Sequence, residues 1–295
     1  MTNNQNQTTV KPKRNYKARL FEKIFSDKKE LLGLYNAVNK THYTNPEELE
    51  INTLENAIYL SMYNDISFVI ASKLSLYEQQ STYNPNLPLR FLLYISDLYS
   101  GMTSSENLYG TRLIKLPPPR FIIFYNGEAE YEERKTLKLS DAYKRKEDNP
   151  SLELQAEFIN INPGKNKELL KACKTLSDYS EYTSKVRKYA KKMEIRKAVE
   201  RAVKECIQEG ILADFLERHR AEAIAVSIYE YNEDRQRQLD RKEGMELGME
   251  LGEKQKLKTI VSKMLKKGYS VDEISDMLEE SVEIIRELSE TKDKS

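Results

Sequence analysis

The sequence predicts an α/β fold, with a mixed sheet flanked by helices over residues 15–164 and an all-helical C-terminal region after it. Two observations support this prediction. Short runs rich in Ile, Tyr, Phe and Val alternate with polar breaks between residues 56 and 162, which is typical of strands. After Lys165 the apolar residues recur at the 3.6-residue period of amphipathic helices, so we expect helices alone beyond it.

The predicted core opens with a helical segment and a meander of strands. Apolar residues recur at helical spacing over residues 15–38, with a break at Ser26–Asp27 that separates two short helices. Three strands are expected next, at Asn56–Ser61, Ile66–Ala71 and Leu74–Glu78. Because short polar stretches separate these strands, we expect neighbours to pair in antiparallel fashion.

A further helix and two strands complete the predicted core. Pro88 suits the first turn of a helix, and a broad apolar face follows it. Arg120–Tyr125 is a compact apolar run, which predicts a strand buried on both faces. We interpret Asn126–Gly127, which ends this run, as a plain turn. The alternation in Leu152–Asn162 predicts the last strand of the core.

Composition changes along the chain predict four parts. Residues 1–14 are polar with a basic end, and we expect a disordered arm there. Residues 15–164 form the predicted core, and residues 165–240 a helical extension. Residues 241–295 are predicted to form a helical tail that interacts with protein partners.

A regular glycine spacing marks the start of this tail. Gly244, Gly248 and Gly252 recur every four residues, which places them on one face of a helix. Glycine weakens a helix interior, so one interpretation is a mobile, weakly helical linker. Small residues also allow close approach of a second helix, so the other interpretation is a helix-pairing seam.

Short helices follow the glycines. An amphipathic helix is expected at Leu257–Lys267, and Ser270 with Glu273 forms a capping box for a second helix at Val271–Leu278. A third helix is expected to begin near Ser281. A DNA-binding helix-turn-helix is one interpretation of this pattern. The acidic residues of the region repel phosphate, which favours a protein-interaction module and a homo-oligomer formed through these helices.

Charge and cysteine content exclude some functions. The chain of 295 residues has 48 Lys+Arg against 47 Asp+Glu, a net charge of +1 that excludes a uniformly basic nucleic-acid coat. Two cysteines are too few for a disulfide framework or a cysteine-based zinc site. The low cysteine use together with 32% charged residues predicts a cytoplasmic location. No apolar run is long enough to span a bilayer, so we expect no membrane association.

Three polar residues near the predicted hairpin form a candidate site. Asp65 opens one strand and Glu78 lies near the end of the next, so a hairpin brings them side by side. Gln80 shares a strand face with Glu78, whereas Tyr77 faces the opposite side and belongs to the core. Carboxylates without His or Cys suit Mg²⁺ or Mn²⁺. By spacing alone, these residues also fit ordinary solvent-facing strand ends.

The residues around this site resemble a known family. NDISF, YEQQSTYNPNLPLRFLLY, LPPPRFIIFYNG, LSDAY and NINPGKN occur in this order between Phe21 and Tyr231. Together they resemble the Rpn family of recombination-promoting nucleases and transposase-like proteins, part of the PD-(D/E)xK nuclease superfamily. The resemblance implies that superfamily's nuclease core. It assigns the two acidic positions to Asp65 and Glu78, and the usual lysine position to Gln80.

The implied function is metal-dependent hydrolysis of DNA phosphodiester bonds, associated with promoting DNA recombination. In this interpretation Asp65 and Glu78 hold Mg²⁺ or Mn²⁺, and Gln80 orients the attacking water. Glutamine in place of lysine leaves the proton-transfer role open. The same replacement favours the alternative, a catalytically weak DNA- or partner-binding protein that retains the nuclease fold.

Basic residues supply candidate DNA contacts. Arg90, at the start of the helix after the site, is either a phosphate clamp or an arginine at the edge of the core. Residues 185–204 hold nine basic and two acidic residues, and on a single helix they would surround it with positive charge. Lys188, Lys191 and Lys192 are therefore candidate phosphate contacts. A solvated helix face explains the same lysines.

Overall fold

The computed structural model describes residues 19–51 and 65–290. The chain divides into two compact units, the first ending at Asp234 and the second beginning at Arg235. The predicted arm over residues 1–14 and the predicted strand Asn56–Ser61 lie outside the described residues. The first unit contains the whole of the described sheet.

The first unit is built on a mixed six-stranded sheet in the order β1-β2-β3-β4-β6-β5. The strands are β1 (Glu50–Ile51), β2 (Ile66–Ile70), β3 (Lys73–Gln80), β4 (Pro119–Tyr125), β5 (Arg134–Lys138) and β6 (Gln155–Asn160). β3 pairs antiparallel with β2 and parallel with β4. β6 lies parallel to β4 and antiparallel to β5. The predicted mixed sheet with its β2–β3 hairpin is confirmed.

Two strands differ from the sequence expectation. β1 has only two residues and pairs with β2. The segment that leads to β1 has no periodic apolar pattern, so the sequence does not predict a strand there. β5 was not predicted, because Leu137 is its only buried residue. A strand at the sheet edge with one buried side chain lacks the alternation that indicates a strand. Its pairing with β6 is decided by the tertiary structure.

An N-cap at Asp27 separates the first two helices, α1 (Leu20–Phe25) and α2 (Lys28–Asn39). The Asp27 carboxylate accepts hydrogen bonds from the backbone N–H groups of Lys29 at 2.8 Å and Glu30 at 3.3 Å. These contacts satisfy donors that have no partner within the helix. The predicted break between two short helices is confirmed.

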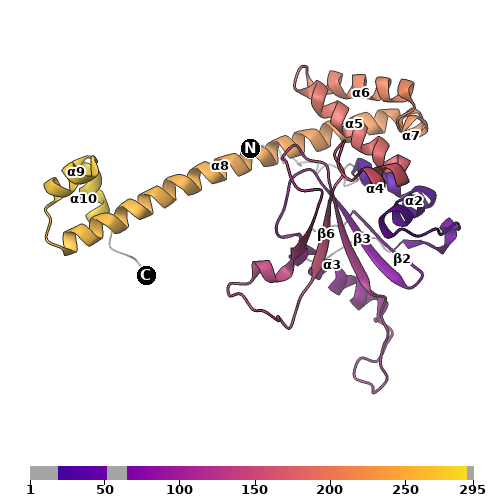
Figure 1. Ribbon diagram of the computed structural model, residues 1–295, viewed down its shortest axis with the longest axis horizontal. Helices are drawn as coiled ribbons and strands as arrows, with labels where there is room; N and C mark the ends of the chain where they lie inside the picture. Colours follow the sequence, from indigo (N-terminus) through magenta and orange to yellow (C-terminus); the bar gives the residue numbers. More distant parts are fainter. Residues whose placement is uncertain (1–18, 52–64, 291–295) are drawn as a thin grey trace, which may run out of the picture. The chain divides into compact units, whose positions relative to one another are not determined.

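Different helices cover the two faces of the sheet (Figure 1). The helix α3 (Leu87–Met102), with Pro88 in its first turn as predicted, packs on one face in a core shared with Leu76 of β3. On the other face, Tyr77 of β3 belongs to a core shared with α1 and α2. The prediction that Tyr77 is a core residue is confirmed.

The side chains of β3 point alternately to the two faces of the sheet, and this decides where the polar residues at the end of β3 lie. Side chains in a strand point to opposite faces in turn. Because Leu76 faces α3, Glu78 and Gln80 lie on that same face, while Gln79 lies on the face of Tyr77. All three polar side chains are buried.

The residues after 165 are helical in the described part of the chain, as predicted. The helices are α4 (Lys167–Ala172), α5 (Lys174–Ala190), α6 (Ile195–Glu209), α7 (Ala213–Arg218) and α8 (Arg220–Lys266). Buried residues from this region, such as Leu176, Val199 and Val226, join the same core as α1 and α2. The helices of the first unit after residue 165 therefore pack on its sheet-containing part.

The expectation of one helix over residues 185–204 is wrong. α5 ends at Ala190, and α6 begins only at Ile195. The reason is a cap, since the Glu194 carboxylate accepts from the backbone N–H groups of Arg196 at 3.0 Å and Lys197 at 3.2 Å. The basic residues therefore belong to two helices and the turn between them.

The second unit contains the end of α8, α9 (Val271–Leu278) and α10 (Val282–Glu290). The predicted capping box of α9 is confirmed, because Ser270 N–H donates to Glu273 Oε2 at 2.8 Å and Glu273 N–H donates to Ser270 Oγ at 3.3 Å. A small core joins these helices: Val261, Ile274, Ile285 and Leu288. Among residues 19–51 and 65–290, no helix has the length and apolar character needed to cross a membrane.

Candidate functional site

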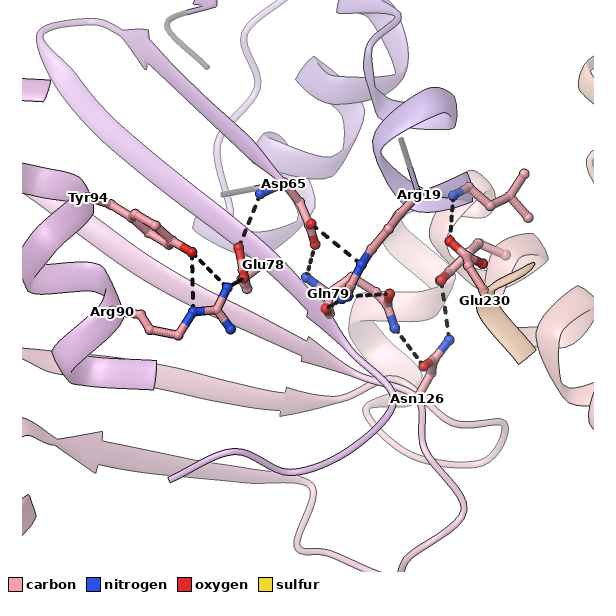
Figure 2. A network of polar contacts seen from close by, with 10 residues as sticks. Arg19, Asp65, Glu78, Gln79, Arg90, Tyr94, Asn126 and Glu230 are labelled. Atoms are coloured by element: carbon pink, nitrogen blue, oxygen red, sulfur yellow. Dashed lines mark hydrogen bonds and ion pairs between the residues drawn. The ribbon is translucent and has the colours of Figure 1, made fainter. Parts of the chain in front are cut away.

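The hairpin of β2 and β3 brings Asp65 and Glu78 into direct contact. Ile66 lies opposite Tyr77 in the antiparallel register, so the preceding Asp65 meets the following Glu78. Asp65 N–H donates to Glu78 Oε2 at 3.1 Å, and Gln79 N–H donates to Asp65 Oδ2 at 2.6 Å (Figure 2). The structure thus places the two predicted acidic residues side by side.

Burial makes this pair electrostatically costly. Asp65 is 8% exposed and Glu78 is 1% exposed. Burial raises the pKa of both carboxyl groups, because the charged form loses hydration, and the Asp65 charge raises the pKa of Glu78 further. Two adjacent buried carboxylates therefore need positive charge close by.

Arginines from two helical segments supply that charge. Arg90 Nη2 of α3 donates to Glu78 Oε1 at 2.6 Å, and the same nitrogen donates to the Tyr94 hydroxyl at 2.7 Å. On the other side, Arg19 Nε lies 4.0 Å from Asp65 Oδ1. Both arginines lower the pKa of their carboxylate partner and so oppose the effect of burial. Figure 2 shows the acidic pair between Arg90 and Arg19.

A second layer of contacts fixes Arg19 and the end of β3. Arg19 Nη1 donates to the Gln79 backbone carbonyl at 2.6 Å. The Gln79 side-chain amide donates to Asn126 Oδ1 at 2.8 Å. Glu230 of α8 accepts from the Leu20 backbone N–H at 2.8 Å, directly beside Arg19 (Figure 2). Helices α1 and α8 and the end of β4 are thereby connected to the acidic pair.

Gln80 lies on the same strand face as Glu78 and is only 4% exposed. Within the described part of the chain, its side-chain nitrogen is buried and has no hydrogen-bond partner. A buried amide donor without a partner costs about 1–3 kcal/mol of stability. A buried donor without a protein partner calls for a ligand or an ordered water as its partner.

The predicted DNA-binding residues lie in two places. Arg90 is in the acidic site, paired with Glu78. Lys188, Lys191 and Lys192 are exposed at the end of α5 and just after it. Lys191 Nζ lies 2.9 Å from Glu128, in the loop after β4. The structure therefore brings Arg90 to the predicted site but gives the lysines a separate, solvent-facing position.

The donor atoms fit a hard divalent cation. Asp65 and Glu78 offer carboxylate oxygens and Gln80 offers an amide, which are the donor types that Mg²⁺ and Mn²⁺ prefer. Within residues 19–51 and 65–290, no cluster of three or more His, Cys, Asp or Glu is arranged to hold a metal. Mg²⁺ in proteins usually keeps several waters and binds through one or two carboxylates.

Sequence reasoning missed several residues of this network. Arg19 contacts Gln79 across 60 positions of sequence, and Asn126, interpreted as part of a plain turn, is buried and bonded to Gln79. Glu22 also lies close to the site, and burial together with the Asp65 charge raises its pKa to about 7. The one signal available was Asn126–Gly127, a polar pair directly after a buried strand.

No protein-family model, curated protein or solved structure matches this chain. The resemblance to the Rpn family, and the nuclease core that it implies, therefore stay predictions.

Proposed function

We propose that this chain is an Mg²⁺- or Mn²⁺-dependent DNA endonuclease with a PD-(D/E)xK-like core. The observation that supports the proposal most is the contact between Asp65 and Glu78, two buried carboxylates on adjacent strands. Gln80, with its unpartnered amide, follows on the same face of β3. The resemblance of the surrounding segments to Rpn nucleases extends the proposal to a role in DNA recombination.

In the proposed mechanism, Asp65 and Glu78 would hold the divalent cation. When bound, such a cation neutralises phosphoryl oxygens and lowers the pKa of a bound water. Gln80 orients the attacking water by hydrogen bonds, a task for which an amide has both donors and an acceptor. Arg90 binds a phosphate oxygen of the DNA through its guanidinium group. Burial of Glu78 keeps the acidic pair shielded from bulk water, which strengthens its electrostatic interactions.

Cleavage of supercoiled plasmid tests this proposal. We expect nicking or linearisation with Mg²⁺ or Mn²⁺ and none with EDTA. Asp65→Asn and Glu78→Gln keep the shape and one acceptor oxygen but replace the other oxygen with an NH₂ group and remove the charge. Each should therefore slow cleavage at least about 100-fold. Circular dichroism reports whether each variant is folded.

Glu47→Gln is a matched control for these variants. Glu47 is an exposed carboxylate that pairs with Lys28 at 2.7 Å in the same compact unit. This variant should cut like the wild type. Cleavage that persists in both Asp65→Asn and Glu78→Gln would exclude the acidic pair from the reaction.

A second candidate is a catalytically weak DNA- or partner-binding protein. The observation that favours it is that arginines already accompany both carboxylates, with Arg90 at 2.6 Å from Glu78 and Arg19 at 4.0 Å from Asp65. DNA binding that is unchanged by EDTA, without cutting under any metal tested, would support this alternative over the nuclease.

We propose in addition that the chain forms homo-oligomers through its C-terminal helices. Over residues 235–256, every side chain with a described exposure is exposed, including Met245, Leu247, Met249 and Leu251. Glu246 and Glu253 lie on the face of α8 opposite the three glycines. Helix propensity alone stabilises a helix only marginally in water, and packing of an apolar face supplies most of the stability of helices in proteins. Pairing of the apolar face of α8 with a second copy of the chain would supply such packing.

A further inference from the structure

Arg90 connects α3 to the acidic pair. Its Nη2 donates to Glu78 Oε1 at 2.6 Å, and its Nε donates to the Tyr94 hydroxyl at 3.2 Å. The side chain of Glu78 is 2% exposed, whereas that of Arg90 is 25% exposed. Arg90 is therefore a partly exposed side chain paired with a buried carboxylate.

Both oxygens of the Glu78 carboxylate have donors. Oε1 accepts from Arg90, and Oε2 accepts from the backbone N–H of Asp65 at 3.1 Å. A divalent cation at Oε1 would stand against the positive guanidinium group, and like charges in a poorly hydrated site repel strongly. Arg90 and a metal ion therefore compete for the same oxygen atom.

We propose that Arg90 is an exchangeable counter-ion of Glu78, which neutralises this carboxylate in the metal-free protein and binds a DNA phosphate once a divalent cation replaces it. This inference rests on the proposed metal site. Tyr94 lies one helical turn after Arg90 and accepts from Nε as well as Nη2. An arginine that leaves Glu78 thus keeps a contact with α3, and its planar fork of donors matches a phosphate group.

The exchange couples metal binding to DNA binding. A cation on Glu78 frees Arg90 for a phosphate, and a phosphate that holds Arg90 leaves Glu78 open to a cation. By thermodynamic linkage, each ligand raises the affinity of the other by the same factor. The exchange also predicts that removing the Glu78 charge exposes an arginine that is otherwise occupied.

DNA binding measured without metal tests whether Arg90 becomes available once the Glu78 charge is removed. In EDTA, with a fluorescein-labelled duplex oligonucleotide, Glu78→Gln should bind roughly tenfold more tightly than the wild type. The double variant Glu78→Gln with Arg90→Met should lose this gain. Asp65→Asn removes an equal charge but leaves the Arg90–Glu78 pair in place, so its gain should be clearly smaller. Equal affinities of Glu78→Gln and the wild type would overturn the proposal.

Metal binding gives an independent readout. By titration calorimetry without DNA, Arg90→Met should bind Mn²⁺ roughly tenfold more tightly than the wild type, because the competing cation is gone. Arg134→Met, which removes an exposed arginine paired with Glu157, is the matched control and should bind Mn²⁺ like the wild type. Unchanged or weaker Mn²⁺ binding by folded Arg90→Met would contradict the exchange.

The two measurements also separate this inference from the proposed function. A wild-type protein that neither binds Mn²⁺ nor cuts DNA would contradict the nuclease proposal. It would also contradict the replacement of Arg90 by a divalent cation at Glu78. The oligonucleotide measurement in EDTA would still decide whether Glu78 occupies an anion-binding arginine. This measurement does not depend on the single variant Arg90→Met being folded. Its main comparison is between the wild type and Glu78→Gln, which keeps Arg90 and an uncharged acceptor for it.

Discussion

The backbone N–H of Asp65 donates a hydrogen bond of 3.1 Å to the carboxylate of Glu78. The contact ties the start of β2 to the end of β3, so that the acidic pair moves with the hairpin rather than with a loop. The Asp65 carboxylate accepts in turn from the Gln79 backbone N–H at 2.6 Å. Residues held by the main chain of a sheet in this way are well positioned for a binding site.

Gln80→Met tests the functional role of a residue that is unfavourable for stability. The Gln80 amide nitrogen is buried without a partner, and methionine has a similar shape without polar hydrogens. We expect the free energy of unfolding in urea to rise by about 1 kcal/mol and cleavage to fall at least tenfold. Gln155→Met, at an exposed position of β6, should change neither. Full cleavage by Gln80→Met would remove Gln80 from the mechanism.

Gly127→Ala tests the packing that holds the end of β3. A Cβ at Gly127 would lie 1.8 Å from the Ser81 carbonyl oxygen and 2.5 Å from the Tyr125 hydroxyl oxygen. Since Ser81 follows Gln80, we expect the site to be distorted and the free energy of unfolding to fall by about 2–4 kcal/mol.

The contrasting variant is Gly33→Ala, on an exposed position of α2 where an added Cβ meets no atom within 4 Å. It should raise the free energy of unfolding by about 0.5–1 kcal/mol, because alanine favours the helix. Thermal and urea unfolding measure both variants. A stable, active Gly127→Ala protein would show that the main chain here adjusts freely.

Glu230→Gln tests the pH dependence of stability. Burial raises the pKa of Glu230 from 4.5 to about 7, despite the hydrogen bond from the Leu20 N–H. Between these values the folded chain binds more protons at this group than the unfolded chain, so stability falls as the pH rises from about 4.5 to about 7. Glutamine lacks this titration. The variant should therefore lose less stability than the wild type between pH 5 and 7.5, by an amount of the order of 1 kcal/mol.

Urea unfolding at several pH values measures this difference. Glu222→Gln is the control, since the hydrogen bond from Lys23 lowers the pKa of Glu222 and gives the opposite sign. It should not flatten the profile in the same pH range. Parallel profiles for wild type and Glu230→Gln would contradict the prediction for Glu230.

Gly248→Glu tests the proposed pairing of α8. Gly248 is exposed and an added Cβ there meets no atom within 4 Å, so the single chain has room for the substitution, which places a charge on the proposed pairing face. We expect light scattering to show an oligomer for the wild type and a smaller species for Gly248→Glu. Gly33→Glu, an equal change at an exposed position of α2, should keep the wild-type mass. A monomeric wild type would contradict the pairing.

Local patterns were sufficient to predict many of the elements. The apolar run of β4, the proline at the start of α3 and the Ser270–Glu273 capping box all act within a few residues, and each is confirmed. The contact of Asp65 with Glu78 was also predictable, because a short hairpin fixes which residues lie opposite one another. The failures are at β1, at β5 and at the turn between α5 and α6. In these places no buried residue, one buried residue or one cap marks the structure.

The acidic pair, the hairpin that carries it and the helices and strands with a clear apolar pattern follow from local sequence. The balance of charge around the pair depends on contacts between distant segments. Arg90 and Arg19 reach the carboxylates from separate helical segments, and contacts between distant segments leave no periodic pattern in a sequence. Burial decided the rest, since the pKa of a carboxyl group depends on which chain segments displace water from it.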